Sequence, residues 1–345
     1  MIQAILAAIL FGISAPISKR LLGDIDPIPL AAFLYLGSGI GVLLYKIIRR
    51  IKNIKAVENE ARLGKGDIKW IAGAVAAGGI AAPIALMYSL QNTAASTASL
   101  LLNFEGAATT IIASIAFKEA IGRRIWLAVI LITSASILLS WDFKGEWGIS
   151  LGALGVLCAC TLWGIDNNFT RNISAKDPLT IVMIKGIGAG TFSLLTAFAI
   201  RSKIPDIKII LFAMLLGCIS YGLSIILFIF AMRKLGASRT SAFFGTAPFM
   251  GVLLSFLLLG ELPNILFFTS LPVMILGAIL ILGEEHIHIH RHETLEHEHR
   301  HCHEDGHHTH IHQSGDQLEH VHIHIHEAVE HSHKHMPDIH HRHEH

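Results

Sequence analysis

Histidines crowd the C-terminal end of this 345-residue chain in a spacing that suits metal coordination. All 23 histidines lie between residues 286 and 345, and many alternate with another residue, as in HIHIH (286–290) and HVHIHIH (320–326). In an extended strand, residues i and i+2 lie on the same face, so each run would present a row of imidazoles. Imidazole suits zinc, nickel, cobalt and copper ions, and the tail is predicted to bind such ions. The strongest candidate ligands are His297, His299, His301, His303, His320, His322, His324 and His326.

The same tail has a strong charge asymmetry. Residues 286–345 carry 4 Lys or Arg against 11 Asp or Glu, so protonation of all the histidines would change the net charge from −7 to +16. The tail could therefore sense pH as well as bind metal, because the protonated, positively charged tail would be attracted to anionic lipid headgroups. The variable spacing and the interleaved acids differ from a cloning tag. Because the tail has few large apolar side chains, it is expected to be disordered without a ligand.

A second set of chemically capable residues lies within apolar sequence. Glu105 and Asn103 occur in LLNFEGA, Asp166 and Asn168 in GIDNNFT, and Lys185 in VMIKGIG. An ionisable group at bilayer depth costs about 2.5–3.5 kcal/mol on insertion scales, so it needs a partner, water or a role. Glu105 is a candidate proton-coupling or substrate-binding carboxylate, with Lys185 as its counter-ion or an anion contact. The alternatives are polar groups that only fix helix packing and, for Asp166, a helix cap.

Membrane-spanning helices must position these residues. About 20 mostly apolar residues cross a bilayer. That criterion gives ten spans with short connections, so both termini lie on one side of the membrane. Loops on that side hold sixteen Lys or Arg and the opposite loops hold six. Because loops rich in basic residues stay in the cytoplasm, both termini are predicted to be cytoplasmic. The expected location is the plasma membrane. The predicted spans are 2–22, 29–48, 70–90, 95–117, 125–141, 148–169, 178–200, 209–232, 238–259 and 264–283.

The apolar part of the chain also repeats itself. ASTASLLLNFEGAATTIIASIAFKE (95–119) aligns without gaps on ASRTSAFFGTAPFMGVLLSFLLLGE (237–261), at an offset of 142. Two copies of five helices are inferred, and because five is odd the second copy is inverted in the membrane. Gly106 and Pro248 align and are expected to weaken their helices at one level, and Pro16 is expected to kink the first span. Glu119 and Glu261, which close the aligned segments, are interpreted as structural or gate-bracing residues.

These features resemble the EamA branch of the drug/metabolite transporter superfamily. The resemblance covers about residues 1–283 and rests on NFEGAATTIIASIAFKE, on TAPFMGVLLSFLLLGE and on the paired five-helix pattern. It implies a permease with a 5+5 inverted repeat that exports or exchanges small metabolites. The expected organisation is an all-α membrane protein with repeats at 1–141 and 142–283 and a disordered tail at 284–345.

Other functional classes fit less well. The membrane part has no histidine to serve as a base for nucleophilic catalysis, and no P-loop motif occurs, so we expect neither an enzyme nor an ATP-driven pump. We expect no nucleic-acid partner and no cofactor for transport; the expected partners are lipid, a small-molecule substrate and tail-bound Zn, Ni, Co or Cu ions. Homodimerisation is left open. Two other hypotheses remain, namely divalent-metal efflux fed by the tail and a non-transporting, membrane-anchored metal store.

Overall fold

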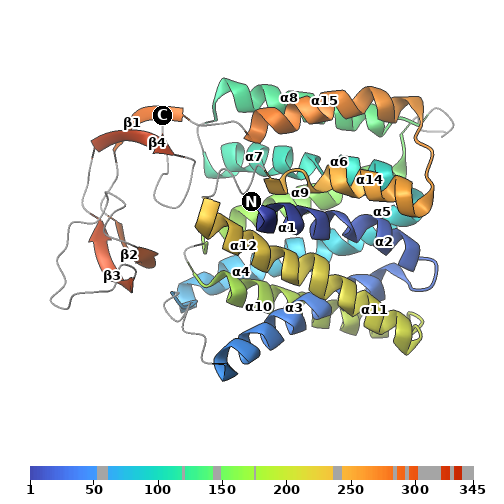
Figure 1. Cartoon of the computed structure of the whole chain (residues 1–345), viewed down its shortest axis with the longest axis horizontal. Coiled ribbons are helices and arrows are strands. Elements are labelled where there is room, and N and C mark those ends of the chain that lie inside the picture. Colours follow the sequence, from blue (N-terminus) through green and yellow to red (C-terminus); the bar gives the residue numbers. More distant parts are fainter. Residues whose placement is uncertain are drawn as a thin grey trace.

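The computed structural model describes residues 1–52, 61–118, 121–142, 149–174, 176–235 and 243–282, together with four short strands between residues 286 and 335. Residues 1–282 form a bundle of roughly antiparallel helices (Figure 1). The α-helices are α1 (Ile2–Gly12), α2 (Ser14–Leu21), α3 (Pro27–Ile51), α4 (Ile68–Ala74), α5 (Ala82–Asn92), α6 (Ala95–Leu101), α7 (Phe104–Phe117), α8 (Arg123–Leu139), α9 (Leu151–Arg171), α10 (Pro178–Ala199), α11 (Ile207–Gly217), α12 (Ser224–Leu235), α14 (Ala247–Leu259) and α15 (Ile265–Leu282). A 3₁₀ turn, η1 (Lys65–Asp67), precedes α4, and two π-helices, η2 (Val75–Ala81) and η3 (Cys218–Leu223), join α4 to α5 and α11 to α12.

The helices have the length and composition of membrane spans. Within the described residues, six helical segments are long and apolar enough to cross a membrane, and α14 and part of α15 are shorter apolar helices. Large apolar side chains such as Leu195, Leu211 and Leu257 are exposed at the surface of the bundle. A helix that is apolar on its outward face as well as its inward face is typical of a lipid environment. The chain is therefore a multi-pass membrane protein.

Several spans are interrupted. Ile13 separates α1 from α2, Leu102 and Asn103 separate α6 from α7, and a turn at 245–246 precedes α14. Pro16 and Pro248 lie in the first turns after two of these breaks, where proline is tolerated because the first N–H groups of a helix have no internal partner. The prediction that Gly106 marks the break in its helix is wrong. Helix α7 runs through Gly106, and the break comes earlier, where Asn103 donates to the carbonyl of Leu100 at 2.9 Å.

Helix α3 lies at the centre of one half of the bundle, against α10 and α11. A methyl group on Gly37 would lie 2.0 Å from the carbonyl oxygen of Met214, and one on Gly217 would lie 1.9 Å from that of Leu34. On the other side of α3, a methyl group on Gly39 would lie 2.5 Å from the backbone nitrogen of Ile187. Only glycine allows these backbones to approach so closely, and small residues at helix contacts are typical of membrane proteins.

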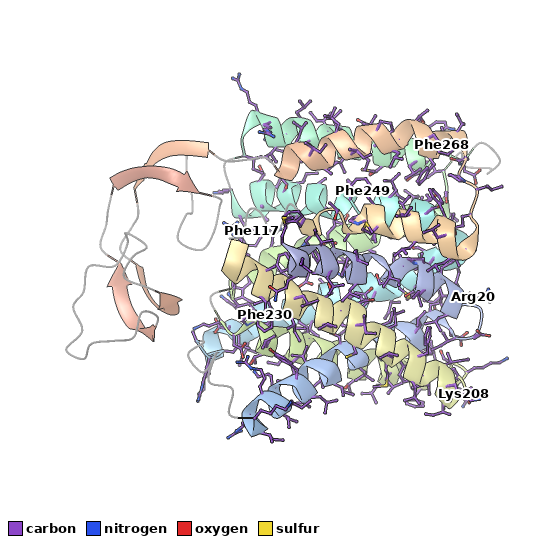
Figure 2. All side chains as sticks on the ribbon, in the orientation of Figure 1. Arg20, Phe117, Lys208, Phe230, Phe249 and Phe268 are labelled. Carbon is purple, nitrogen blue, oxygen red and sulfur yellow. The ribbon has the colours of Figure 1, made fainter. Side chains whose placement is uncertain are left out.

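An ion pair ties α3 to α10 at one end of the bundle. Lys46 Nζ lies 2.7 Å from Oδ2 of Asp177, the residue before α10, and 2.6 Å from the hydroxyl of Thr180. Burial of the Asp177 carboxyl raises its pKa, but hydrogen bonds from Lys46 and Thr180 outweigh burial, so the pKa lies below its ordinary value. The N-terminus of α1 and the C-terminus of α15 lie at the same end of the bundle, whereas Arg20 and Lys208 lie at the opposite end (Figures 1 and 2).

The histidine-rich tail contains four strands, which differs from the expectation of a disordered segment. They are β1 (His286–Arg291), β2 (Leu295–His301), β3 (His320–His326) and β4 (Glu330–His335). β1 pairs with β4 and β2 with β3, both antiparallel. Alternation of histidine with isoleucine or valine, as in β1 and β3, has the period of two and the β-branched residues that favour strands. The rest of the tail, including His303, lies outside the described residues.

The glycine contacts around α3 predict how the fold responds to a single added carbon. The variant Gly217→Ala places a methyl group against the backbone of α3, and we expect the overpacking to cost about 1–3 kcal/mol. Thermal unfolding of the purified protein in detergent measures this as a lowered midpoint. The control is Gly66→Ala in η1, where an added methyl group meets no atom within 4 Å. Equal midpoints for the two variants would contradict the packing argument.

Candidate functional site

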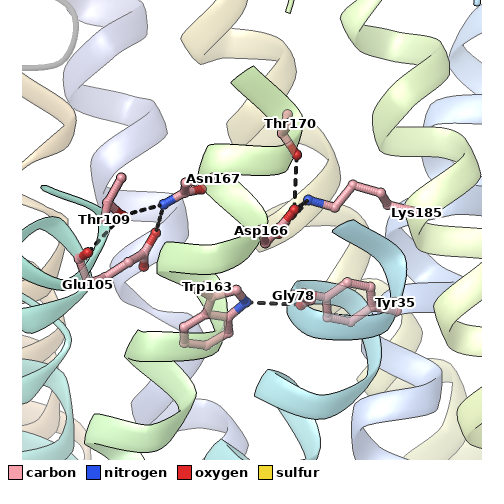
Figure 3. Close-up of polar contacts among 9 residues, drawn as sticks. All are labelled: Tyr35, Gly78, Glu105, Thr109, Trp163, Asp166, Asn167, Thr170 and Lys185. Atoms are coloured by element: carbon pink, nitrogen blue, oxygen red, sulfur yellow. Dashed lines mark hydrogen bonds and ion pairs between the residues drawn. The ribbon is translucent and has the colours of Figure 1, made fainter. Parts of the chain in front are cut away.

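Glu105 lies at the start of a helix inside the bundle. Because the break at Leu102 and Asn103 starts a new helix at Phe104, Glu105 belongs to the first turn of α7. A helix N-terminus carries partial positive charge and stabilises a carboxylate there. Oε1 of Glu105 also accepts a hydrogen bond from Nδ2 of Asn167 on α9 at 2.9 Å (Figure 3). The same nitrogen lies 3.1 Å from the Thr109 hydroxyl, which donates to the backbone oxygen of Glu105 at 2.8 Å. The acid is thus held between α7 and α9.

Asp166 and Lys185 form an ion pair that joins α9 to α10. Lys185 Nζ lies 2.7 Å from Oδ1 and 2.6 Å from Oδ2 of Asp166, and the Thr170 hydroxyl donates to Oδ1 at 2.9 Å. The Asp166 side chain is 5% exposed and that of Lys185 is 19% exposed. Asp166, for which a helix cap was one alternative, is buried within α9. Lys185, considered above as the counter-ion of Glu105, pairs with Asp166.

The π-helix η2 presents a backbone carbonyl to this region. The carbonyl of Gly78 accepts from the Tyr35 hydroxyl at 2.7 Å and from Nε1 of Trp163 at 3.0 Å (Figure 3). A methyl group on Gly78 would lie 1.9 Å from Oδ2 of Asp166, so a larger residue would displace the ion pair. π-Helices disturb the regular hydrogen-bond ladder and occur frequently at functional sites. We call this group of residues the central polar cluster. Its members are Tyr35, Gly78, Glu105, Thr109, Trp163, Asp166, Asn167, Thr170 and Lys185.

Aromatic rings extend the cluster toward the other half of the chain. The ring of Tyr221, from the second π-helix η3, lies 5.7 Å from the ring of Tyr35 and 5.7 Å from that of Phe11. A small pocket opens beside them, at the level of the breaks in three spans. Its lining includes Phe11 and Ser14 around the α1–α2 break, Leu102 at the α6–α7 break, and Pro248 in α14. Helices from both halves therefore meet around one partly polar volume.

The charges of the central polar cluster do not cancel. The carboxylate of Asp166 is paired with the ammonium group of Lys185, so the carboxyl group of Glu105 has no basic counterpart in the cluster. In the part of the chain that the structure describes, no cationic side chain forms an ion pair with Glu105. Its hydrogen-bond donor is the neutral amide of Asn167. Such a group can exchange a proton or bind the polar part of a ligand.

The two other predicted asparagines contact backbone. Asn103 donates to Leu100 at the helix break, and Asn168 donates to the carbonyl oxygens of Thr109 at 3.0 Å and Gly164 at 2.8 Å. Both therefore stabilise the helices that carry the cluster. In the described part of the helical bundle, no group of three or more His, Cys, Asp or Glu side chains is placed to hold a metal ion.

Glu261 lies outside the cluster, near one end of the bundle. Its two carboxylate oxygens each accept a backbone N–H of α6, from Ala95 and Ser96, at 2.7 Å. Lys19 of α2 donates to the carbonyls of Leu90 and Gln91 just before α6. Leu90 and Gln91 belong to the end of α5, so these contacts join α2 to α5 and the segment after α14 to the start of α6. Glu119, its counterpart in the aligned repeat, lies outside the described residues.

Sequence reasoning missed several members of the cluster. Tyr35, Trp163 and Thr109 are ordinary residues of apolar helices in the sequence, and only the fold brings them to Gly78 and Asn167. A signal existed for Gly78, because AAGGIAAP is rich in small residues and ends in proline. The run Asp166-Asn167-Asn168 also marked this turn of α9, although only the fold shows that its middle residue contacts Glu105.

The buried ion pair predicts a pattern for paired substitutions. Lys185→Met leaves the Asp166 carboxylate without its partner, and we expect a loss of about 3–5 kcal/mol in stability. The double variant Asp166→Asn/Lys185→Met removes both charges, and we expect it to recover most of that loss. A double-mutant cycle of unfolding in detergent measures the coupling. Additive effects of the two single substitutions would show that the pair contributes no coupling energy.

Comparisons with known proteins agree with the helical architecture. The chain is 26% identical over 294 residues to a protein described as an uncharacterized transporter from Methanothermobacter thermautotrophicus, with 81% of this chain and 85% of that protein covered. A solved crystal structure shares the fold with a TM-score of 0.57 at 15% identity, and the match covers 81% of this chain and 94% of that one. The model of the EamA-like transporter family matches residues 1–141 and 150–283. These residues include nearly all of the helical bundle, and the chain therefore belongs to the EamA-like transporter family.

Proposed function

We propose that the protein is a gradient-driven transporter that moves small metabolites by alternating access, by efflux or exchange, with the central polar cluster as its substrate and coupling site. The observation that carries this proposal is Glu105. It is the eleventh residue of the 23-residue apolar span Ala95–Phe117, and no cation among the described residues pairs with it. A carboxyl group at that depth is costly, and a packing role alone would be served by a neutral residue. Glu105 acts as a proton-coupling or substrate-binding group, next to the Asp166–Lys185 pair.

Matched features in the two halves support an inverted repeat of five plus five helices. The helix breaks at 102–103 and 245–246, the π-helices η2 and η3, and the left-handed residues Lys118 and Gly260 each recur 142 or 143 positions apart. The packing is matched as well. α3 contacts α10, α8 contacts α15 and α6 contacts α14, and the contact between α5 and α9 has its counterpart in that between α1 and α12. Inverted repeats allow two mirror-related states around a midplane site, which is the basis of alternating access.

The break in α6–α7 and the two π-helices are the points at which such a motion bends the chain. Helices in transporters are commonly interrupted beside the substrate cavity, where freed backbone groups find other partners. Gly78 illustrates this, since its carbonyl is held by Tyr35 and Trp163 from two other helices. At the end of the bundle near Arg20, the contacts of Glu261 and Lys19 brace the helices that would open.

The orientation and the tail complete the proposal. Basic residues in the last turn of α3, Arg49 and Arg50, accompany the two termini at one end of the bundle, and such residues favour the cytoplasmic side. The histidine-rich tail then lies in the cytoplasm, where it binds transition-metal ions as a sensor or buffer. The tail is an accessory to transport, because the described membrane part has no metal-ligating cluster.

Flux through proteoliposomes tests the role of Glu105. The purified protein is reconstituted, and the exchange of labelled amino acids, nucleosides, organic acids and amines is measured under a pH gradient. We expect wild-type protein to move at least one of these classes and Glu105→Gln to lose at least tenfold in flux, because the ionisable group is gone. Asp24→Asn, which removes an exposed carboxylate between α2 and α3, is the matched control and retains flux.

Two outcomes would contradict the proposal. Unchanged flux in correctly folded Glu105→Gln would exclude Glu105 from coupling and substrate binding. Zinc, nickel or cobalt flux that persists in a chain truncated after Gly283, with no metabolite flux, would instead assign metal as the cargo of the bundle.

A further inference from the structure

The tail strands pair in a register that aligns histidine with histidine. In β2–β3, the directly opposed positions are His297 with His324, His299 with His322, and His301 with His320. In β1–β4 they are His286 with His335, His288 with His333, and His290 with His331. Six histidine pairs therefore occur in two sets of three. We call these sets the inner ladder (β2–β3) and the outer ladder (β1–β4).

Strand geometry places each ladder on a single face. Alternate positions of a strand share a face, and directly opposed positions of antiparallel strands share it too, with Cα atoms about 4.5–5.5 Å apart. Two neighbouring pairs thus bring four histidine positions within about 7 Å along and about 5 Å across the strands. Four nitrogen ligands complete the tetrahedral sphere that Zn²⁺ adopts in structural sites.

The strands have little else to hold them together. The opposite face of the inner ladder pairs Glu296 with Ile325, Glu298 with Ile323 and Arg300 with Val321, which mixes charged and apolar residues. An isolated two-stranded sheet is marginally stable in water. Formation of the inner ladder must also close the 18 residues between β2 and β3, at a cost in chain entropy. Some further interaction is needed to keep the strands paired.

We propose that each ladder is a binding site for a divalent transition-metal ion of the zinc type, and that the bound ion holds its two strands together. The outer ladder pairs the histidines of the HIHIH run with His331, His333 and His335, which spacing alone did not single out. The two sites are built from strands that are distant in sequence, so metal occupancy folds the tail. This inference deepens the metal-binding part of the proposed function and is independent of whether the bundle transports metabolites.

The register makes a prediction that composition does not. The background is the full-length protein with His286→Ala, His288→Ala and His290→Ala, which removes one strand's histidines from the outer ladder. In this background, two double variants each remove one opposed pair from the inner ladder. His297→Ala/His324→Ala removes an end pair and leaves two neighbouring pairs. His299→Ala/His322→Ala removes the middle pair and leaves two pairs separated by about 13 Å along the strands, too far to share one ion. Both variants have the same composition.

Zinc affinity and stoichiometry are measured in detergent by competition of zinc chloride with a chelator of known affinity. Far-UV circular dichroism, taken as the difference with and without zinc, reports strand formation. We expect the end-pair variant to bind zinc within about threefold of its background and to keep the spectral change. The middle-pair variant is expected to lose at least tenfold in affinity together with the spectral change.

Equal affinities for the two double variants would overturn the proposal, because they would show that the tail chelates zinc by composition, as a flexible chain does. Zinc binding without a strand signal in the silenced background would overturn it as well. Neither result depends on flux, so a failure of the transport proposal is distinguishable from a failure of this one.

Discussion

The organisation of the bundle depends on how charge is accommodated inside a membrane. A lone ionised group at bilayer depth is unfavourable by several kcal/mol, and Asp166 and Lys185 meet that constraint by pairing across α9 and α10. Their pairing leaves no room for a side chain on η2, so position 78 is glycine. The carbonyl of that glycine then receives Tyr35 and Trp163, which positions α3 and α9. One electrostatic requirement thus sets the relative positions of four spans.

Glu105 meets the same constraint differently. Its helix starts at Phe104, the residue before it, and the N–H groups of that first turn, together with Asn167, stabilise charge without a cation. A carboxyl group stabilised by neutral dipoles can gain or lose a proton with less disturbance than one locked in an ion pair. The two acids of the cluster are therefore suited to different roles, Asp166 to structure and Glu105 to chemistry.

The sequence predicted much of the bundle because membrane spans are defined by length and hydropathy, both local properties. Helices α3, α10 and α15 begin and end within a few residues of the predicted spans 29–48, 178–200 and 264–283. The position of Glu105 near the middle of the predicted span 95–117 followed from the same span boundaries. The partner of Lys185 did not follow from the sequence, because two acids, Glu105 and Asp166, were candidates and only helix packing selects Asp166. The helix break was predicted at Gly106, but the neighbouring Asn103 stabilises an earlier one, through a backbone contact that residue type alone does not reveal. The pairing of the tail strands could not be predicted from the sequence, because it depends on partners 19 to 49 residues away.

The cancellation of charge between Asp166 and Lys185 also bears on the electrical behaviour of the transport cycle. A fixed and neutral pair adds nothing to the charge that crosses the bilayer, so in the cycle that we propose the cargo and a proton on Glu105 would be the groups that respond to the membrane potential. One elementary charge that crosses 100 mV gains or loses about 2.3 kcal/mol, equivalent to roughly a fiftyfold concentration ratio. Under the proposed mechanism, the protonation state of Glu105 would decide whether a neutral solute is moved by voltage or by its own gradient alone.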